Sequence, residues 1–536
     1  MSETQLLTGG RIYSPGSPDA TAMAVTGGMV TWVGQDAPGR ALHPNAEHLD
    51  LHGAFVAPAF VDAHVHATSA GLQLAGLDLA GCRSLAECLA TLRTFVAAHP
   101  GAPVWGHGWE ETAWPEARPP SRAELDAAAG DAAVYLSRID VHSALVSTAL
   151  LERAPQARDA DGYHQDGPLS KQAHHHVRRS AQDSLTGEDR AAAQLAFLRH
   201  AAARGVACVH ECAGPDISSP QDLTDLLTLA SRTGTPEVIG YWGELGGVET
   251  ARRLGAHGAG GDLFVDGALG SRTAALREPY ADDPANSGAR YLDAEQIAEH
   301  LVACTRAGMQ AGFHVIGDAG IAEVVAAAEL AAEIVGVPAM AARHHRLEHL
   351  EMINADDARR LAALGMIASM QPLFDAAWGG ERLQYARRLG LPRGTTLNPF
   401  ATVAASGMPL AFGSDAPVTP IDPWATVRAA VHHRTEGQGI SPRAAFTAHT
   451  RGGWRAGGDQ DGHTGTLVPG AAATYAVWDA ERLVTAAPDS RVQRWSTDPR
   501  AGVPPLPDLT EVAKLPSCMR TVLRGEVIYN SAGSAP

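Results

Sequence analysis

The chain has 536 residues and a formal net charge of −17, and 45% of its residues are hydrophobic. This composition is typical of a globular protein, and the negative charge argues against sustained binding to nucleic acid or an anionic membrane, because both need basic patches. No apolar run approaches the roughly 18 residues of a membrane-spanning helix, and the first residues lack the basic start and apolar core of a secretory signal.

Both ends of the chain are rich in short strand-like segments. Residues 4–56 contain such segments with Gly-Gly turn signals, and similar segments recur at 465–478 and 519–529. An isolated hairpin is only marginally stable in water, so we expect the two ends to combine. The sequence predicts one small β-sandwich domain composed of residues 1–57 and 464–536.

Between these ends, apolar strand-like runs alternate with Ala- and Leu-rich helical stretches. We expect eight strands, at residues 55–64, 206–210, 236–242, 261–266, 310–314, 345–349, 366–371 and 408–414. Eight strand–helix units predict an α/β fold, a (β/α)8 TIM-like barrel within residues 58–463. The gap after the first strand is too long for one helix, so we expect a large insertion at about 70–180.

Histidines and one aspartate follow the predicted strands. They are His64 and His66 at the first strand, His314 at the fifth, His349 at the sixth and Asp415 at the eighth. The two imidazoles of His64-Val65-His66 face the same side of a strand, and active sites of such barrels lie at the C-terminal strand ends. Neutral imidazoles with a carboxylate suit zinc or a similar metal. The competing interpretation, solvent-facing strand caps, is weaker because each residue falls at a predicted strand end in barrel order.

Five motifs surround these residues. They are FVDAHVH at 60–66, LFVDGALGSRTAAL at 263–276, HVIGDAG at 314–320, RLEHLEM at 346–352 and GSDAPV at 413–418. Together they resemble the amidohydrolase superfamily, and within it the amidohydrolase-3 branch, which includes N-substituted formamide deformylase-like proteins.

The resemblance implies a divalent metal, most simply zinc, with one or two ions per chain. Its implied ligands are His64, His66, His314, His349 and Asp415. Asp415 is also implied to be the general base, which takes a proton from a metal-activated water and passes it to the leaving nitrogen. With one ion bound, His349 would orient the water instead of holding a second ion.

One stretch departs from this resemblance. Many relatives carry a carboxylated lysine in a K-x-F-x-D-G pattern, where this chain has DLFVDG at 262–267. Neither lysine of the chain, Lys171 or Lys514, lies on a predicted barrel strand, so we expect no carboxylated lysine. Asp262 and Asp266 alternate onto one face, and either could be a replacement ligand or a buried structural aspartate. We expect one tightly bound metal if neither reaches the site.

Other residues are candidates for substrate binding. Ser271 and Arg272 follow a Gly-rich loop and could hold a substrate carboxylate or carbonyl, with a structural loop salt bridge as the alternative. Asp266 could also face the substrate. His142 could roof the site or join an internal ion-pair network, and Trp109 could form an apolar wall or belong to the core of the insertion.

A histidine run and two glutamates are further candidates. His174-His175-His176 is predicted to be a solvated run, because consecutive residues do not share a helix face. Glu211 and Glu244, after the second and third strands, are weaker candidates for bridging metals.

The sequence therefore predicts an enzyme that hydrolyses a non-peptide carbon–nitrogen bond in a linear amide or an N-acyl or N-formyl compound. The alternative is a mononuclear-metal deaminase of a ring amine or amidine, which the missing lysine would suit. A metal-binding barrel without catalysis is disfavoured by the complete set of five site residues. We expect a small-molecule substrate, and the sequence leaves open whether the chain forms a homodimer. Six scattered cysteines without a CxxC pair predict a reducing, cytoplasmic setting.

Overall fold

A barrel of eight parallel strands forms the centre of the computed structural model, which describes residues 4–232, 234–485 and 504–532. In spatial order the strands are β7 (Phe60–Val65), β13 (Val206–Ala213), β14 (Glu237–Trp242), β15 (Gly258–Ala259), β16 (Gln310–Val315), β17 (Arg346–His349), β18 (Ile367–Met370) and β19 (Leu410–Phe412). The barrel closes through backbone hydrogen bonds from Asp415 to His64 and from His66 to Ala416, of 2.8 and 2.9 Å. The predicted barrel is confirmed.

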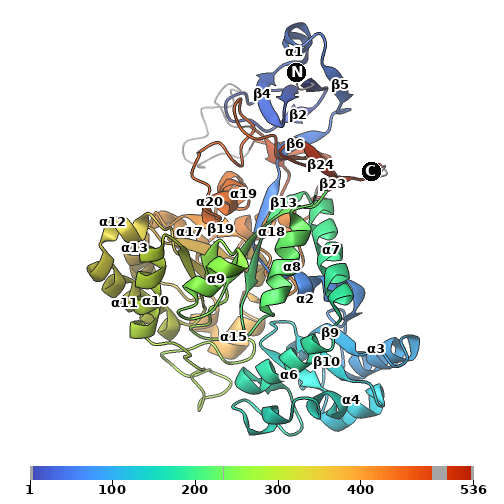
Figure 1. The fold of residues 1–536 in the computed structure, drawn as a ribbon, viewed down its shortest axis with the longest axis vertical. Helices are drawn as coiled ribbons and strands as arrows, with labels where there is room; N and C mark the ends of the chain where they lie inside the picture. The colour runs from blue at the N-terminus through green and yellow to red at the C-terminus, as the bar shows by residue number, and fades with distance from the viewer. Residues whose placement is uncertain (1–3, 233, 486–503, 533–536) are drawn as a thin grey trace.

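Helices follow or cover the barrel strands (Figure 1). They are α2 (Ala67–Ala75), α7 (Gly187–Ala203), α8 (Pro220–Ala230), α9 (Val248–Leu254), α10 (Ala294–Ala307), α11 (Asp318–Val335), α12 (Val337–Ala341), α13 (Ala355–Ala363), α14 (Pro372–Trp378), α15 (Gln384–Leu389), α16 (Leu391–Gly394), α17 (Phe400–Ala405), α18 (Pro423–Val431), α19 (Pro442–Ala448) and α20 (Arg451–Ala456). In α11, Ile321, Val324 and Ala328 are buried at helical spacing, so this face packs on the barrel. Asp293 caps the start of α10, and Gly308 ends it in a left-handed conformation.

The fourth barrel strand is shorter and earlier than expected. The prediction of a strand over 261–266 is wrong, because β15 covers only Gly258–Ala259. Gly260 and Gly261 follow with φ angles of 156° and 83°, which favour glycine. A Cβ on Gly260 would also lie 2.0 Å from the backbone nitrogen of Gly312. The regular strand ends at this glycine pair, and the next residues keep only an isolated parallel bridge to β16, between Phe264 and His314.

The predicted first strand is in fact two strands. Residues 55–64 divide into β6 (Phe55–Pro58) and β7, which are separated by Ala59. β6 pairs with β2 (Arg11–Ile12) and with β20 (Tyr475–Asp479), whereas β7 belongs to the barrel. Because both strands are apolar, the sequence pattern did not show that the chain passes from one sheet to another at Ala59.

The two ends of the chain combine in small sheets at one end of the molecule (Figure 1). One sheet has the order β2-β6-β20-β23-β24, with β23 (Ser517–Leu523) and β24 (Glu526–Asn530). The other has the order β4-β3-β1-β5, built from β1 (Thr4–Thr8), β3 (Ala22–Thr26), β4 (Met29–Gly34) and β5 (Glu47–Asp50), with helix α1 (Asp36–Leu42) nearby. Strands β21 (Leu483–Val484) and β22 (Leu506–Pro507) form a separate pair. Leu7, Val56, Tyr475 and Val522 share one apolar cluster between the two larger sheets. The exact boundaries at 57 and 464 stay a prediction.

The insertion forms its own layer at the other end of the molecule (Figure 1). Its sheet has the order β12-β11-β10-β9-β8, built from β8 (Leu77–Asp78), β9 (Val104–Trp109), β10 (Val134–Arg138), β11 (Ser143–Val146) and β12 (Leu169–Ser170). Around it lie α3 (Leu85–Ala98), α4 (Arg122–Ala129), α5 (Thr148–Leu151), α6 (Lys171–Asp183) and 3-10 turns at Glu111–Ala113 and Pro155–Asp159. Leu92, Trp109 and Leu125 belong to a separate apolar cluster of this region.

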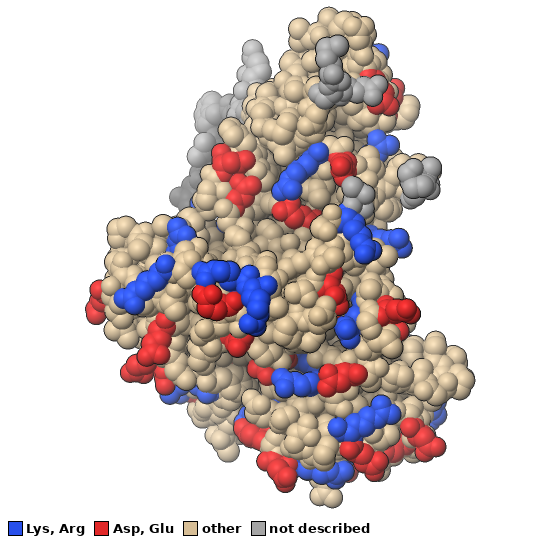
Figure 2. Space-filling view, viewed as in Figure 1, with Lys and Arg blue, Asp and Glu red and all other residues tan. Residues whose placement is uncertain are grey.

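The surface and the cysteines bear on the expected setting. Among the described residues, none of the helices has the length and apolar character that crossing a bilayer requires. On the face shown in Figure 2, basic and acidic side chains are interspersed. All six cysteines are free. The cytoplasmic setting and the choice between monomer and homodimer stay predictions.

Candidate metal centre

Six buried side chains from five segments meet at the C-terminal mouth of the barrel. They are His64 and His66 at the end of β7, Asp262 after β15, His314 on β16, His349 on β17 and Asp415 after β19, and we call them the floor of the site. The His66 Nε2 atom lies 3.1 Å from an oxygen of Asp262 and 3.2 Å from one of Asp415. The structure therefore brings together the five residues selected from the sequence and Asp262, one of the two predicted replacement ligands.

Asp262 occupies the middle of the floor. Its Oδ1 atom lies 3.3 Å from His314 Nδ1, 3.5 Å from His64 Nε2 and 3.8 Å from His349 Nε2. Its Oδ2 atom faces His66 instead. The glycine pair before it carries the short side chain into the mouth, where an aspartate at the end of a regular strand would reach less far. Each oxygen thus faces a different set of imidazoles, as a carboxylate between two cation positions would.

Two floor residues have an unusual backbone. His349 and Asp415 have φ angles of 72° and 55°, values that non-glycine residues rarely adopt. Such conformations cost roughly 1–3 kcal/mol each and persist where surrounding structure enforces them. The positive φ at His349 turns its ring toward the mouth although Glu348, the residue before it, already faces the barrel interior. The strained backbone at these two residues orients their side chains.

Buried hydrogen bonds orient two of the imidazoles from behind. His64 Nδ1 donates to Glu348 at 2.8 Å, and Glu348 in turn accepts from Arg346 Nε at 2.6 Å. His349 Nδ1 donates to the Gln371 side-chain oxygen at 2.8 Å. A proton held on Nδ1 leaves the Nε2 lone pair available for a cation. Arg346, Glu348 and Gln371 were not among the residues predicted from the sequence. The first two lie at alternate positions of the RLEH motif, which indicates one face of a strand.

The atoms left without partners test whether a metal fits. His64 Nε2, His349 Nε2 and Asp415 Oδ1 are buried side-chain atoms that form no hydrogen bond. Ligand atoms of His64, His66 and Asp415 lie within 4.8 Å of one another, as do those of His64, Asp262 and His349. Unpartnered buried polar atoms are costly, and a divalent cation would satisfy these. Imidazole and carboxylate donors also match the preferences of zinc. The residues fit the expected metal.

The charges of the floor stabilise one another. Burial opposes the charged form of His66, but the adjacent carboxylates of Asp262 and Asp415 raise its pKa to about 9. Burial also opposes ionisation of the two carboxyl groups, yet the surrounding histidines, His64 foremost, hold the pKa of both Asp262 and Asp415 below the usual range. Both aspartates are therefore carboxylates, ready to bind a cation that displaces protons from the imidazoles.

Asp266, the other candidate replacement ligand, has a different role. Its oxygens accept backbone N–H groups of Ala275, Ile316 and Gly317 at 2.9, 2.9 and 2.7 Å. Burial raises the pKa of its carboxyl to about 7, although these donors oppose the rise. The geometry favours the structural alternative for Asp266, which ties the loop after β15 to β16 and α11, over substrate binding.

Three other substrate-binding candidates also make structural contacts. Ser271 donates to Asp140 at 2.7 Å, and Arg272 forms an ion pair with Asp282 at 2.9 Å. The Trp109 indole is buried in the insertion and donates to a backbone carbonyl at 2.8 Å. None of the three lines the cavity at the floor.

The two glutamates after strands two and three lie apart from the cluster as well. Glu211 accepts the backbone N–H of Ala67 at 2.7 Å, and Glu244 accepts the indole N–H of Trp242 at 2.7 Å. Neither glutamate lies between the histidines of the floor.

A small cavity lies between the floor and the insertion. Its volume is about 20 Å³, which is room for one water molecule. The residues that line it from the insertion are Val141, His142, Lys171, His174, His175 and Arg178, and we call them the roof. The ring of His142 lies 5.1 Å from that of His314, centroid to centroid. His142 therefore lies over the floor, and its part in substrate binding stays a prediction.

The histidine run at 174–176 corrects a prediction. His174 is buried and lies 2.8 Å from the Tyr135 hydroxyl, and His175 lines the cavity. The expectation of a solvated run is wrong for these two residues, because the buried face of α6 comprises Ala173, His174, Val177, Arg178 and Ala181. The apolar stripe at 173, 177 and 181 was the signal available in the sequence. Lys171, which lies on no barrel strand, also lines the cavity.

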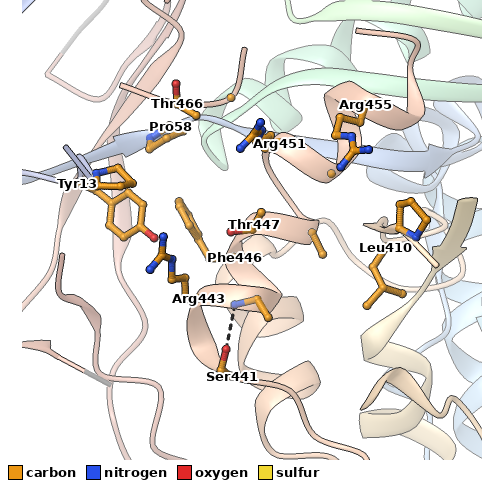
Figure 3. Close-up of a pocket in the computed structure, with 16 residues that line it drawn as sticks. Tyr13, Pro58, Leu410, Ser441, Arg443, Phe446, Thr447, Arg451, Arg455 and Thr466 are labelled. Carbon is orange, nitrogen blue, oxygen red and sulfur yellow. Dashed lines mark hydrogen bonds between the residues drawn. The ribbon is translucent and has the colours of Figure 1, made fainter. Parts of the chain in front are cut away.

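A larger groove lies at the opposite, N-terminal end of β19 (Figure 3). It has a volume of about 600 Å³ and is lined by residues that include Tyr13, Pro58, Leu410, Arg443 and Phe446. It contains none of the floor residues, and barrel enzymes place their chemistry at the C-terminal face. The chemistry of the side chains, and not the size of the hollow, identifies the candidate site.

Comparisons with known proteins give matches over most of the chain. The family model described as "Amidohydrolase family" matches residues 47–529. The Arabidopsis thaliana protein LONG AFTER FAR-RED 3 is 28% identical over 88% of this chain and 88% of its own length. Putative amidohydrolase YtcJ of Bacillus subtilis is 27% identical over 74% of this chain and 77% of that protein. A crystal structure of an uncharacterized metal-dependent hydrolase from Pyrococcus horikoshii matches with a TM-score of 0.70 and 25% identity, covering 89% of this chain and 98% of that one.

The narrower resemblance to formamide deformylases has partial support. N-substituted formamide deformylase of Arthrobacter pascens is 31% identical, but over only 25% of each chain. The resemblance at the level of the family is therefore confirmed, and the choice of substrate within it stays a prediction.

Proposed function

Because this chain belongs to the amidohydrolase family, we propose that it hydrolyses a carbon–nitrogen bond other than a peptide bond, in a linear amide or an N-acyl or N-formyl compound, with zinc at the floor. The observation that carries the proposal is the convergence of four imidazoles and two carboxylates with unpartnered buried atoms. The family is one of metal-dependent hydrolases, and the donor set suits zinc.

Floor residues would hold the metal. His64, His66 and Asp415 form one donor group, and Asp262 with His349 extends it. A bound divalent ion would lower the pKa of an attacking water and polarise the scissile carbonyl. His64 and His349 keep their Nε2 atoms directed inward through Glu348 and Gln371.

Asp415 acts as the general base. It is buried, its Oδ1 atom has no hydrogen-bond partner, and its lowered pKa keeps it ionised. A carboxylate in this state accepts a proton from the attacking water and then delivers it to the leaving nitrogen, so that the amine departs neutral. The positive φ of Asp415 fixes the direction in which it acts.

The roof completes the site by excluding bulk water. Burial and the neighbouring charges lower the pKa of His142 well below its usual value, so this ring is neutral. A neutral imidazole can donate or accept one hydrogen bond at the substrate carbonyl or leaving group. The small volume of the cavity means that a substrate displaces lining side chains when it enters; Tyr291 at the rim is 38% exposed.

A substrate screen tests the proposal. Zinc-loaded protein is incubated with N-formyl amines, N-acyl amines and ring amines, and formate, carboxylate and ammonia are measured. We expect formate or carboxylate release, abolished by chelation and restored by zinc. Ammonia from ring amines alone would select the deaminase instead, and no release from any class would reject both enzymes.

A further inference from the structure

Arg178 is a buried cation in the roof. It lies on α6, is 9% exposed, and lines the cavity that also contains Asp262 and Asp415. It borders a second small cavity as well, together with His66 and Ile217. Arg178 therefore borders the space above the floor from the side of the insertion.

The hydrogen bonds of Arg178 are all to uncharged acceptors. Nη1 donates to the Asp216 carbonyl at 3.1 Å, Nε to the Tyr135 hydroxyl at 3.4 Å, and Nη2 to the Val141 carbonyl. In the described part of the chain, no carboxylate forms an ion pair with it. These bonds use three of the five guanidinium N–H groups, which leaves one N–H on each Nη nitrogen.

Its surroundings do not supply the missing negative charge. Burial is the largest cause that lowers the pKa of His142 and His174 well below normal, and the charge of Arg178 lowers it further. These neighbours are therefore neutral. Burial is the main cause that lowers the pKa of His175 to about 4. The Lys171 ammonium is paired with Asp161 at 3.2 Å. The Asp216 carboxylate is 45% exposed and lies 3.9 Å from His175.

An unpaired buried charge is costly unless something compensates it. The paired carboxylates of the floor belong to the candidate metal centre, so they do not serve this purpose. A planar guanidinium with one free N–H on each terminal nitrogen is suited to a carboxylate held by two parallel hydrogen bonds.

We propose that Arg178 binds a carboxylate of the substrate, so that the substrates are N-acyl or N-formyl compounds of an amino-acid type. This assignment rests on the proposed function, because it places the scissile carbonyl at the floor and the carboxylate at the roof. His142, between the two, would lie beside the bond that is cleaved. Arg178 is then the residue that selects anionic substrates.

The test compares matched substrates and matched variants. Each N-formyl or N-acetyl amino acid is paired with its carboxamide, which has the same shape but no negative charge. The variants are Arg178→Met and Arg178→Lys, and Arg179→Met is the control, since Arg179 is an exposed neighbour on the same helix that bonds only the Pro215 carbonyl.

We expect the wild-type protein and the Arg179→Met variant to prefer the carboxylate substrate in kcat/KM. Arg178→Met should lower this preference about 10–100-fold, as for loss of hydrogen bonds to a charged group, mainly through KM. Arg178→Lys should retain part of it. An equal loss for both substrates in Arg178→Met would overturn the proposal and leave Arg178 a structural tie, as would a wild-type preference for the carboxamide. If Arg178→Met does not fold, the wild-type preference and the Arg178→Lys variant decide.

A binding measurement separates this inference from the proposed function. Titration calorimetry with N-acetyl amino acids and their carboxamides is made on metal-free protein, where no turnover occurs. If the carboxylate binds in an Arg178-dependent way but the zinc-loaded protein hydrolyses no amide, the proposed reaction is rejected and the anion site is kept. Hydrolysis of neutral amides without Arg178-dependent binding would do the reverse.

Discussion

The floor and the roof of the cavity are both buried, polar and rich in histidine, but they balance charge differently. In the floor, carboxylates lie among the imidazoles and balance positive charge there, and they raise the pKa of His66 to about 9. In the roof, burial makes the imidazoles neutral, and the Arg178 cation has only uncharged partners. The unpartnered atoms of the floor suit a metal ion, whereas the unpaired cation of the roof suits an anionic group of the substrate. The floor should therefore act on every substrate alike, and the roof should discriminate.

Substitution Asp415→Asn should produce the largest effect. Asparagine keeps an oxygen toward the floor but cannot accept a proton, so kcat should fall about 10²–10⁴-fold on every substrate. The control is Asp422→Asn, the same change at the N-cap of α18, where asparagine caps equally well. Steady-state kinetics on a charged and a neutral amide measure both. Wild-type turnover in Asp415→Asn would remove this residue from the mechanism.

Substitution Asp262→Ala tests the centre of the floor. Removal of a carboxylate that faces four imidazoles should weaken metal binding by more than the ~10–100-fold typical of an outer partner. Element analysis after dialysis should show less metal per chain than in wild type, and activity should not depend on bicarbonate, since we expect no carboxylated lysine. Asp282→Ala, on the neighbouring loop, should keep the wild-type metal content. If Asp262→Ala binds as much metal as wild type, Asp262 is structural.

Substitution Gln371→Leu probes the orientation of His349 without touching a charge. Loss of the 2.8 Å bond to Nδ1 should lower metal affinity or kcat roughly 10–100-fold. Gln194→Leu removes another buried amide, which bonds Thr68 and Asp222 and no histidine, and serves as the control for general destabilisation. Equal behaviour of the two variants would mean that His349 needs no such support.

The neutral histidines outside the floor predict a pH limit on stability. Burial lowers the pKa of His107, on β9 of the insertion, to about 4. Since the unfolded chain takes up that proton near pH 6.5, the stabilising contribution is present above pH 6.5 and is lost as the pH falls toward 4, by about 3 kcal/mol if the histidine stays buried. Thermal unfolding of His107→Asn should depend less on pH in this window, whereas exposed His463→Asn should follow wild type. Parallel curves for all three proteins would contradict this origin.

The sequence predicted the floor better than the roof because the two follow different rules. His64, His66, His314, His349 and Asp415 lie at or just after strand ends, and a parallel barrel brings such positions to one mouth whatever the loops do. The reach of Asp262 depended on the glycine pair at 260–261, which the strand-like alternation after it concealed.

The roof comes from a helix of the insertion, whose place over the barrel depends on packing between distant parts of the chain. His174 and Arg178 flank an apolar stripe on α6, so the spacing alone could have shown that they are buried. It could not have shown that they face the barrel mouth.

The pairing of β6 with β20 has a consequence for the order in which the protein is made. Phe55 pairs with Trp478, more than four hundred residues later, and β6 runs almost directly into the strand that carries His64 and His66. At about 5–20 residues per second, a ribosome needs roughly 20–80 s to synthesise that interval. During this time β6 lacks its partner β20, and until residues 410–412 are made β7 also lacks its neighbour β19. The nascent chain therefore exposes an apolar strand edge for most of its synthesis, and the catalytic mouth is assembled only when translation is almost complete.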